Sequence, residues 1–455
     1  MMFLQEAAQA TNGLLSGADV EFFSVSTDTR EDLHGKLFVA LRGERFDAHE
    51  FLAQAAAQGA VAALVDTREN LQAPAGLPLL KVTDTRLALG ALARHWRTKF
   101  AIPLIGVTGS NGKTTVKEMC ASILRVWLGD DAVLATQGNL NNDIGLPQML
   151  LRLRADHRAA VIEMGMNHPG EITYLVALAR PTVAIVTNAQ RAHLEGMGGL
   201  LAVAAEKGEI YRAMGADGVA IINVDDEHAA YWYANHGVAE ALSFGLAHAA
   251  DVSAECVAQG LGSLVRLRTP QGEAEFVLPV PGLHNVRNAL GAAAVTLAAG
   301  APLDAVVRGL SHFVGAKGRL QRKPAFAGAV LLDDTYNANP DSVRAGIDVL
   351  ASTPGSKLLV LGDMGEIGEM SAQYHDEVGG YAKSAGVDRL FALGEQSRLA
   401  ARNFGSGGEH FESVEALVDA VKLALGPDAV VLVKGSRFMR MERVAEALAL
   451  PQNKD

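Results

Sequence analysis

The sequence predicts an α/β protein with three domains. Short apolar segments alternate with helical patterns of ten or more residues, which is typical of parallel sheets covered by helices on both faces. The length of 455 residues corresponds to about three domains of about 150 residues each. The composition changes at residues 71–78, which hold two prolines and a glycine, and at residues 313–323, which are rich in glycine and basic side chains. We therefore expect domains at residues 1–82, 83–313 and 314–455.

The individual elements follow from hydrophobic patterns and helix-start signals. A strand at residues 79–82 precedes a helix that Thr83 and Asp84 open and that runs towards Trp96. The middle segment is expected to hold strands at residues 102–107, 159–162, 182–187 and 219–223, and a helix at residues 113–124. The last segment is expected to hold strands at residues 329–332, 357–361, 389–393 and 429–433. Since parallel sheets bind ligands at the carboxyl ends of their strands, we expect the functional residues there.

The charge balance narrows the class of partner. The chain has 51 acidic and 40 basic side chains and a net charge of −11. This excess of acidic groups gives no basic surface for nucleic acid, although a local site can still bind an anion. The two cysteines, Cys120 and Cys256, fit a reducing compartment.

Targeting and membrane signals are not predicted. The first residues, MMFLQEAAQ, lack the basic region of a signal peptide. The longest uncharged stretch, residues 288–303, is shorter than the about 20 apolar residues that cross a bilayer. We therefore expect a cytoplasmic protein that does not insert into a membrane.

A glycine-rich segment at residues 106–115 has the properties of a phosphate-binding loop. It follows an apolar strand and opens a helix, so that backbone N–H groups and the positive end of the helix can face one anion. Lys113 adds a full charge for the β- and γ-phosphates, and Thr114 offers a hydroxyl to magnesium. Val107 stands where the G-x-x-x-x-G-K-T form requires glycine, and a glycine turn without a ligand is the alternative. The expected nucleotide-binding residues are Gly109, Ser110, Asn111, Gly112, Lys113, Thr114 and Thr115.

Residues 108–115, TGSNGKTT, resemble the nucleotide loop of the Mur ligases, which are ATP-dependent enzymes that form amide bonds in peptidoglycan synthesis. The resemblance extends, in the family's order, over all three expected domains. It implies an N-terminal α/β domain that binds a uridine-diphosphate substrate, a central ATP-binding domain with a P-loop and a parallel sheet, and a Rossmann-like C-terminal domain.

The first domain resembles the family in residues 26–30, STDTR, and residues 35–51. The resemblance implies that Thr27 and Asp28 hydrogen-bond the ribose or uracil of the substrate and that Arg30 binds a phosphate or a base edge. The planar donor fork of arginine suits this role. The alternative is an exposed Asp-x-Arg turn that is only solvated.

The loop at residues 136–147, TQGNLNNDIGLP, resembles the family's contact with the sugar and peptide part of the substrate. The resemblance implies that Asn139 and Asn142 bind this substrate. The alternative is an Asn-rich polar turn without a ligand.

The implied metal ligands lie on neighbouring segments of the middle domain. Glu163 ends an apolar strand, where a buried carboxylate is costly unless it is paired or bound to a metal. The resemblance implies that Glu163 and His193 bind Mg²⁺ at two sites, and that Lys207 reacts with carbon dioxide to form a carbamate that helps to hold the second ion. The alternatives are a surface or core histidine and a helical lysine paired with a glutamate.

The remaining nucleotide contacts are implied at and beyond the second boundary. Residues 281–290 resemble the element near adenine, which implies that Asn285 reads the base; a helix cap is the alternative. In the last domain Arg319 is implied to reach the nucleotide and Asp334 its ribose, and we expect both to engage only when this domain closes. The implied residues at the edge of the active site are Tyr336, Asn337 and Asn339, for which ordinary strand-to-helix turns are the alternative.

The resemblance implies an ATP-dependent ligase with Lys113, Glu163, His193 and Lys207 as catalytic residues. The Asn-Leu-Asn-Asn and Asn-Ala-Asn-Pro segments favour the branch that adds D-Ala-D-Ala to a UDP-N-acetylmuramoyl-tripeptide through an acyl phosphate. The alternatives are a sister ligase that adds a single amino acid, a folylpolyglutamate synthase, and a regulator that only binds or hydrolyses a nucleotide. We expect a monomer whose partners are the two substrates.

Overall fold

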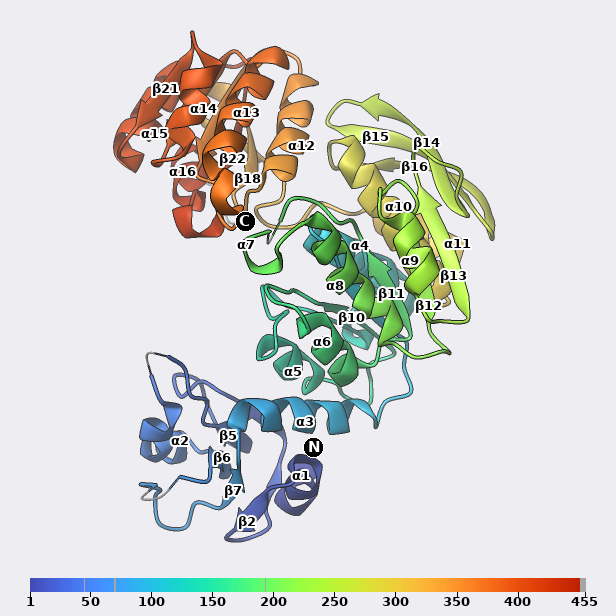
Figure 1. Cartoon of the computed structure of the whole chain (residues 1–455), viewed down its shortest axis with the longest axis vertical. Coiled ribbons are helices and arrows are strands. Elements are labelled where there is room, and N and C mark those ends of the chain that lie inside the picture. Colours follow the sequence, from blue (N-terminus) through green and yellow to red (C-terminus); the bar gives the residue numbers. More distant parts are fainter. Residues whose placement is uncertain (45, 69–70, 193, 451–455) are drawn as a thin grey trace. The chain divides into compact units, whose positions relative to one another are not determined.

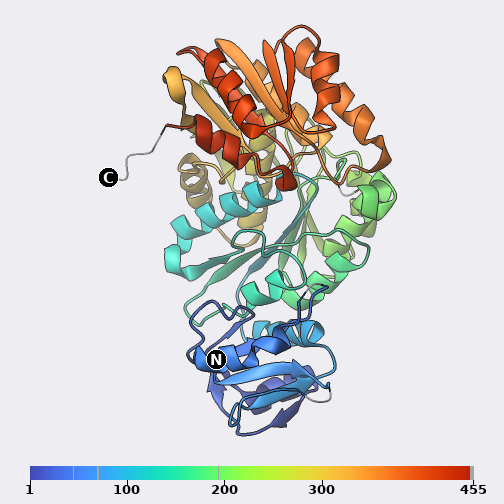
Figure 2. The same cartoon turned by 90° about the vertical axis from the view of Figure 1, so that its left-hand side faces the viewer.

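The computed structural model describes residues 1–44, 46–68, 71–192 and 194–450, and Figures 1 and 2 show it from two directions. The chain forms two compact units, which are described separately. The first unit consists of residues 1–106, 130–166 and 170–182, and the second consists of residues 107–129, 167–169 and 183–455.

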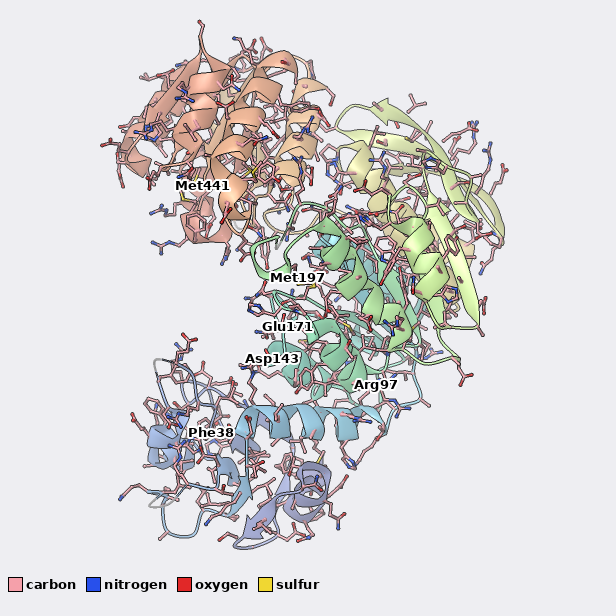
Figure 3. All side chains as sticks on the ribbon, viewed as in Figure 1. Phe38, Arg97, Asp143, Glu171, Met197 and Met441 are labelled. Atoms are coloured by element: carbon pink, nitrogen blue, oxygen red, sulfur yellow. The ribbon has the colours of Figure 1, made fainter. Side chains whose placement is uncertain are left out.

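The first unit begins with a five-stranded sheet in the order β2-β7-β6-β5-β4. Its strands are β2 (Leu14–Ser16), β4 (Ser24–Ser26), β5 (Lys36–Val39), β6 (Ala62–Asp66) and β7 (Leu79–Val82), which pair in parallel except for β2. A separate antiparallel pair joins β1 (Met2–Phe3) to β3 (Glu21–Phe22). The helices are α1 (Leu4–Thr11), the 3₁₀ turn η1 (Ala48–Phe51) and α2 (Leu52–Ala57). Phe38, labelled in Figure 3, belongs to the buried core between sheet and helices.

Helix α3 (Thr85–Arg97) has the start that the sequence predicts. The Asp84 carboxylate caps it by accepting hydrogen bonds from the N–H groups of Arg86 and Leu87 at 2.8 and 2.9 Å. The other end is anchored by Arg97, which is 6% exposed and is labelled in Figure 3. Its Nε donates to the Ala179 carbonyl at 2.9 Å, so a buried guanidinium ties α3 to the end of another helix of the same unit.

The rest of the first unit contains the start of the central sheet. Strand β8 (Leu104–Thr108) passes from the first unit into the second. Beside its start, β9 (Val133–Ala135) and β10 (Ala159–Glu163) pair in parallel. The helices here are η2 (Asp130–Ala132), α5 (Gly145–Leu150) and α6 (Glu171–Ala179). The expected strand at residues 102–107 starts two residues later, and the strand at residues 159–162 extends by one residue to Glu163.

The second unit continues the central sheet from the end of β8. The strands β11 (Val183–Val186), β12 (Val219–Asn223), β13 (Glu240–Gly245) and β14 (Val252–Gln259) lie in sequence order and pair in parallel. Strands β15 (Gly262–Thr269) and β16 (Gly272–Leu278) extend the sheet in antiparallel pairing. The helices are α4 (Lys113–Leu128), α7 (Leu194–Met197), α8 (Leu200–Arg212), α9 (Ala229–Asn235), α10 (Leu283–Ala298) and α11 (Leu303–Ser311).

The antiparallel extension adds to the parallel sheet that the sequence predicts for this domain. In β15, Val265 and Leu267 are buried while Arg266 and Arg268 are exposed, which is the alternation of a half-solvated antiparallel strand. Short glycine turns join β14, β15 and β16, so antiparallel pairing needs no crossover helix.

The C-terminal sheet has six strands in the order β17-β18-β22-β19-β20-β21. They are β17 (Gln321–Pro324), β18 (Val330–Asp334), β19 (Ser356–Gly362), β20 (Arg389–Leu393), β21 (Gly408–Phe411) and β22 (Ala429–Lys434), all parallel to their neighbours except β17. The helices are α12 (Pro340–Ala351), α13 (Ser371–Ser384), α14 (Ser397–Phe404), α15 (Val414–Ala424) and α16 (Glu442–Leu448), with short turns η3 (Phe326–Gly328), η4 (Gly368–Met370) and η5 (Arg437–Met439). Helices α12–α14 form one buried core with the sheet, and α15 and α16 form another, which is the doubly covered arrangement that the sequence predicts.

In the described part of the chain, none of the helices combines the length and the apolar character that crossing a membrane requires.

Candidate active site

The glycine loop between β8 and α4 has a shape that depends on two glycines. Gly109 has a φ of 147° and Gly112 a φ of 82°, which side chains rarely adopt. A Cβ added at Gly109 would lie 1.8 Å from the Thr187 hydroxyl oxygen, and one at Gly112 would lie 2.4 Å from Asn288 Oδ1. The loop therefore turns tightly into the first turn of α4, whose N–H groups and positive end form an anion site.

The segment after β11 holds this loop in place. The Ser110 N–H donates to the Asn188 carbonyl, and the Asn111 N–H donates to Asn188 Oδ1, both at 2.9 Å. The Thr187 hydroxyl donates to the Asn111 carbonyl at 2.6 Å, and the Ser110 hydroxyl donates to the Gln190 carbonyl at 3.0 Å. We did not predict these supporting residues, although their position at the carboxyl end of a strand was a usable signal.

Two lysines face the same region of the second unit. Lys113 Nζ donates to the carbonyls of Gly109 and Ser110 at 2.6 and 3.1 Å, so its charge lies over the loop. Lys207, on α8, is 1% exposed. Burial, followed by the charge of Lys113, holds the pKa of Lys207 well below its ordinary value, while Glu206 acts in the opposite direction. A neutral amine at this position is a nucleophile, which is the form that carbon dioxide requires.

Glu163 lies at the end of β10 in the first unit and is 2% exposed. Its Oε1 accepts a hydrogen bond from Asn141 Nδ2 at 2.8 Å, and its N–H donates to the Thr136 hydroxyl at 2.9 Å. Its Oε2 is buried and has no hydrogen-bond partner among the described residues. An uncompensated carboxylate oxygen is costly, and a hard cation such as Mg²⁺ would relieve that cost, so this residue fits a metal ligand. We did not predict the supporting role of Asn141, the second asparagine of the Asn-Leu-Asn-Asn segment.

The other implied metal ligands receive less support. His193 lies outside the described residues. Thr114 stands in the first turn of α4, at the loop. Among the residues that the structure describes, no group of three histidine, cysteine or carboxylate side chains could hold a metal by itself.

A cavity of about 340 Å³ lies within the second unit and is lined by the glycine loop, α10 and the C-terminal domain. Its volume is in the range of small-molecule sites. It brings together six of the predicted nucleotide-binding residues: Asn111, Gly112, Thr115, Asn285, Arg319 and Asp334. Arg287 and Asn288, from the element expected near adenine, also line the cavity, as does Lys434 at the end of β22. Further lining residues that we did not predict include Asn223, Asp225, Asp226 and Phe244.

Asn285 lines this cavity, but its side chain is already engaged. Its Nδ2 donates to the Pro281 carbonyl at 2.7 Å, and its Oδ1 accepts from Asn288 Nδ2 at 3.2 Å. These hydrogen bonds support the start of α10, whose N-cap is Gly282 and has no side-chain cap, so the structure does not bear out the capping alternative. Base recognition by the remaining N–H of Asn285 stays a prediction. The neighbouring His284 also lines the cavity, and burial lowers its pKa to about 4, so its imidazole is neutral.

Arg319 and Asp334 reach the cavity from the C-terminal domain. The Arg319 guanidinium lies 4.1 Å from the ring centre of Tyr336 in a cation–π contact, and its buried Nε has no partner among the described residues. Asp334 Oδ2 accepts from Lys434 Nζ at 2.6 Å, and its Oδ1 accepts from the Leu320 N–H at 3.2 Å. Asp334 is thus positioned by Lys434, whose pKa is lowered by burial against the opposing effect of Asp334.

The predicted substrate-binding residues of the first unit make hydrogen bonds and ion pairs with other residues of that unit. Thr27 Oγ1 accepts from Gln148 Nε2 at 3.1 Å. Asp28 and Arg30 pair with each other on the surface, with Arg30 Nη2 2.6 Å from Asp28 Oδ2, and this arginine lowers the pKa of Asp28 to about 2. Asn142 Oδ1 accepts from the N–H of Gly145, the first residue of α5, at 2.8 Å, and Asn139 is exposed. Their substrate contacts stay predictions.

Asn337 and Asn339 lie before and at the start of α12 in the C-terminal domain. Asn337 Oδ1 accepts from the Ala338 N–H at 2.9 Å. Asn339 is the N-cap of α12, where its Oδ1 accepts from the Ser342 N–H at 2.9 Å. Both therefore shape the turn beside the cavity, and binding of substrate by either stays a prediction.

A glycine loop before a helix, beside a cavity that the C-terminal Rossmann-like domain helps to line, is typical of a nucleotide-binding α/β enzyme. Three family models match the chain: "Mur ligase family, catalytic domain" at residues 22–97, "Mur ligase middle domain" at residues 107–296, and "Mur ligase, glutamate ligase domain" at residues 318–437. The chain belongs to the Mur ligase family, and it is an ATP-dependent ligase with that family's three-domain fold.

Individual relatives match over almost the full length. The UDP-N-acetylmuramoyl-tripeptide–D-alanyl-D-alanine ligase of Escherichia coli K12 is 44% identical over 98% of both chains, and the ligase of the same name from Bacillus subtilis is 33% identical, again over 98% of both. A crystal structure of MurF from Acinetobacter baumannii matches with a TM-score of 0.89 and 39% identity over 97% of both chains. MurF from Thermotoga maritima in complex with ADP matches with a TM-score of 0.82 and 25% identity over 93% of this chain and 96% of that one.

Proposed function

We propose that this chain joins D-Ala-D-Ala to the terminal carboxylate of UDP-N-acetylmuramoyl-tripeptide, with conversion of ATP to ADP and phosphate. The observation that carries the proposal is the cavity that the glycine loop shares with Arg319 and Asp334. The relatives that match the chain over nearly its whole length bear the name of this reaction. We further propose that the reaction takes place in the cytoplasm, that the enzyme acts as a monomer, and that its domains are residues 1–82, 83–313 and 314–455.

The chemistry begins with activation of a poor electrophile. A carboxylate resists attack by an amine, so the tripeptide carboxylate first attacks the γ-phosphorus of ATP and forms an acyl phosphate and ADP. Lys113 leaves the loop carbonyls that it contacts and neutralises charge on the β- and γ-phosphates. Arg319, held on Tyr336, offers a second cation from the C-terminal domain. This electrostatic stabilisation is the main contribution of the chain to the first step.

The second step forms the amide. The free amine of D-Ala-D-Ala attacks the carbonyl carbon of the acyl phosphate, a tetrahedral intermediate forms, and its collapse expels phosphate. Water would hydrolyse the acyl phosphate, so we propose that the C-terminal domain, which lines the cavity, closes over the site and protects the intermediate. In the first domain, Thr27, Asp28 and Arg30 hold the uridine-diphosphate end, and Asn139 and Asn142 hold the sugar and peptide part. At the start of α12, Tyr336, Asn337 and Asn339 shape the edge of the site.

The proposed metal ligands are Thr114, Glu163, His193 and Lys207 as a carbamate. The unpaired, buried Glu163 Oε2 and the buried amine of Lys207 fit this assignment. When bound, Mg²⁺ at two sites neutralises phosphate charge. Carbamylation converts the neutral Lys207 amine into an anion, which the neighbouring charge of Lys113 stabilises rather than opposes.

A phosphate-release assay tests the acceptor. With ATP and UDP-N-acetylmuramoyl-tripeptide, we expect phosphate release to require D-Ala-D-Ala, and single amino acids such as lysine, diaminopimelate or D-glutamate to support none. The omission of acceptor is the control, because a protected acyl phosphate does not turn over. Release with a single amino acid would instead identify a sister ligase, and release that ignores every acceptor would identify a nucleotide-hydrolysing regulator.

A further inference from the structure

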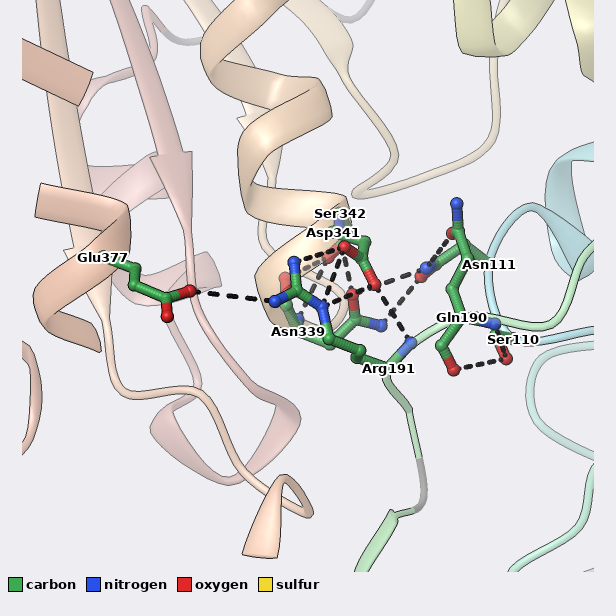
Figure 4. A network of polar contacts seen from close by, with 8 residues as sticks. All are labelled: Ser110, Asn111, Gln190, Arg191, Asn339, Asp341, Ser342 and Glu377. Carbon is green, nitrogen blue, oxygen red and sulfur yellow. Dashed lines mark hydrogen bonds and ion pairs between the residues drawn. The ribbon is translucent and has the colours of Figure 1, made fainter. Parts of the chain in front are cut away.

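Arg191 joins the segment that supports the glycine loop to the C-terminal domain. It lies three residues beyond Asn188, which holds the loop. Its Nη2 donates to Asp341 Oδ1 at 2.6 Å, its Nε lies 3.1 and 3.2 Å from the two carboxylate oxygens, and its backbone N–H donates to Oδ2 at 3.0 Å (Figure 4). Asp341 stands in the first turn of α12. Arg191 Nη1 also lies 3.7 Å from Glu377 Oε2 on α13.

A second bridge connects the glycine loop itself to the same turn of α12. Asn339 Nδ2 donates to Asn111 Oδ1 at 2.8 Å, and Asn111 Nδ2 donates to Gln190 Oε1 at 2.7 Å (Figure 4). Asn339 is the N-cap of α12. The loop and the start of α12 are therefore tied together at two points within the second unit.

The Arg191–Asp341 pair is the stronger of these two bridges. The two side chains are only 26% and 23% exposed, and a charged fork on a carboxylate binds more strongly than neutral amides do. A partly buried pair is also screened less by salt than an exposed one. The pair therefore provides a specific contact between the central and C-terminal parts of the cavity wall.

The start of α12 directly follows the residues that meet the nucleotide. Asp334 ends β18 and Tyr336, which supports Arg319, comes two residues later. Only two residues, Asn337 and Ala338, then separate Tyr336 from the N-cap of α12. A displacement of the start of α12 away from the glycine loop would also move Asp334 and the Tyr336–Arg319 stack. The contact between α12 and the loop therefore determines whether these residues lie at the nucleotide cavity.

We propose that Arg191 is a positioning residue which, through Asp341, couples the nucleotide loop to the C-terminal domain and holds Asp334 and the Tyr336–Arg319 stack against the nucleotide cavity. This role rests on the proposed function. Without the pair, the start of α12 contacts the glycine loop in a smaller fraction of the free enzyme molecules. The apparent affinity for nucleotide falls in proportion to that fraction. Saturating nucleotide restores docking, so KM for ATP rises while kcat is retained.

The test compares ADP binding by calorimetry and steady-state ligation in Arg191→Ala, Arg191→Lys, Asp341→Asn and the double variant Arg191→Ala/Asp341→Asn. We expect Arg191→Ala to weaken ADP binding and raise KM for ATP about tenfold, a typical size for coupling between sites, with kcat within about twofold. Arg191→Lys, which keeps the charge but loses the fork, should be intermediate. The double variant should be no weaker than Arg191→Ala, because partners in one pair are not additive.

Arg308→Ala is the matched control, since Arg308 pairs with Asp304 at 2.9 Å on the exposed surface of α11; its ADP affinity should equal that of the wild type. Unchanged ADP affinity in Arg191→Ala, additive losses in the double variant, or a loss of kcat at saturating ATP would overturn the role of Arg191. Absence of ADP binding by the wild-type chain would instead refute the proposed function.

Discussion

Replacement of Lys113 with alanine is expected to lower kcat/KM for ligation by at least about 1,000-fold, since removal of a cation that stabilises phosphoryl transfer has effects of this order. Lys113 Nζ lies over the carbonyls of Gly109 and Ser110 at the start of α4, where the terminal phosphates of ATP are expected. Its loss leaves the charge that develops on the γ-phosphoryl group without its nearest cation. Phosphate release and chromatography of the ligated product would both measure the effect.

Lys422→Ala is the control for the lysine substitution. Lys422 is exposed on α15, where its ammonium lies 4.8 Å from the Phe326 ring, and it does not line the cavity. We expect this variant to keep wild-type kinetics, and both variants to keep the wild-type melting temperature. Retention of more than about a tenth of the activity in Lys113→Ala would contradict the assignment of Lys113 to the γ-phosphate.

Lys207→Ala is expected to lose most activity, at least about 10- to 100-fold, since even groups that only support metal ligands have effects of this size. The lysine is buried, and burial together with the Lys113 charge lowers its pKa, so the neutral amine that reacts with carbon dioxide exists at lower pH than in an exposed lysine. The carbamate should be lost as the pH falls through that lowered pKa. A short carboxylic acid such as acetate should restore part of the activity of Lys207→Ala, because it supplies an anion to the space that the side chain leaves.

Two observations accompany the Lys207 test. Lys207→Arg cannot form a carbamate and should stay inactive with or without acetate. Wild-type enzyme in ¹³C-bicarbonate should give a carbamate signal in NMR that Lys207→Ala lacks. Full activity of the alanine variant in buffer free of carbon dioxide would show that Lys207 is a structural lysine.

Features that depend on local sequence were predictable. The helix start at Asp84, the glycine loop before Lys113 and the end of β10 at Glu163 all follow from short segments whose residues interact with each other or with one backbone turn. The sequence did not predict the antiparallel β14–β16 extension, because exposed charged residues on one face of its strands alternate with single apolar residues on the other face. Continuous apolar segments predict strands buried on both faces, whereas these strands alternate between buried and exposed positions.

The site residues that the sequence did not predict were overlooked for a different reason. Asn188, Asn141, Lys434 and Arg191 each act through a partner distant in sequence: Asn111, Glu163, Asp334 and Asp341 respectively. No local pattern marks such a partner, because the pairing arises only when the topology brings two loops together. Asp28 and Arg30 are the opposite case, because their spacing within one turn already accounts for their pairing without any substrate.

The transfer of oxygen between substrates tests the central claim most directly. UDP-N-acetylmuramoyl-tripeptide labelled with ¹⁸O in its terminal carboxylate is incubated with the enzyme, ATP and D-Ala-D-Ala, and the released phosphate is examined by mass spectrometry. The account predicts one ¹⁸O atom in each phosphate, because the carboxylate oxygen that attacks the γ-phosphorus leaves with it when the amide forms. Phosphate without ¹⁸O, alongside formation of the ligated product, would contradict activation of the carboxylate by phosphorylation.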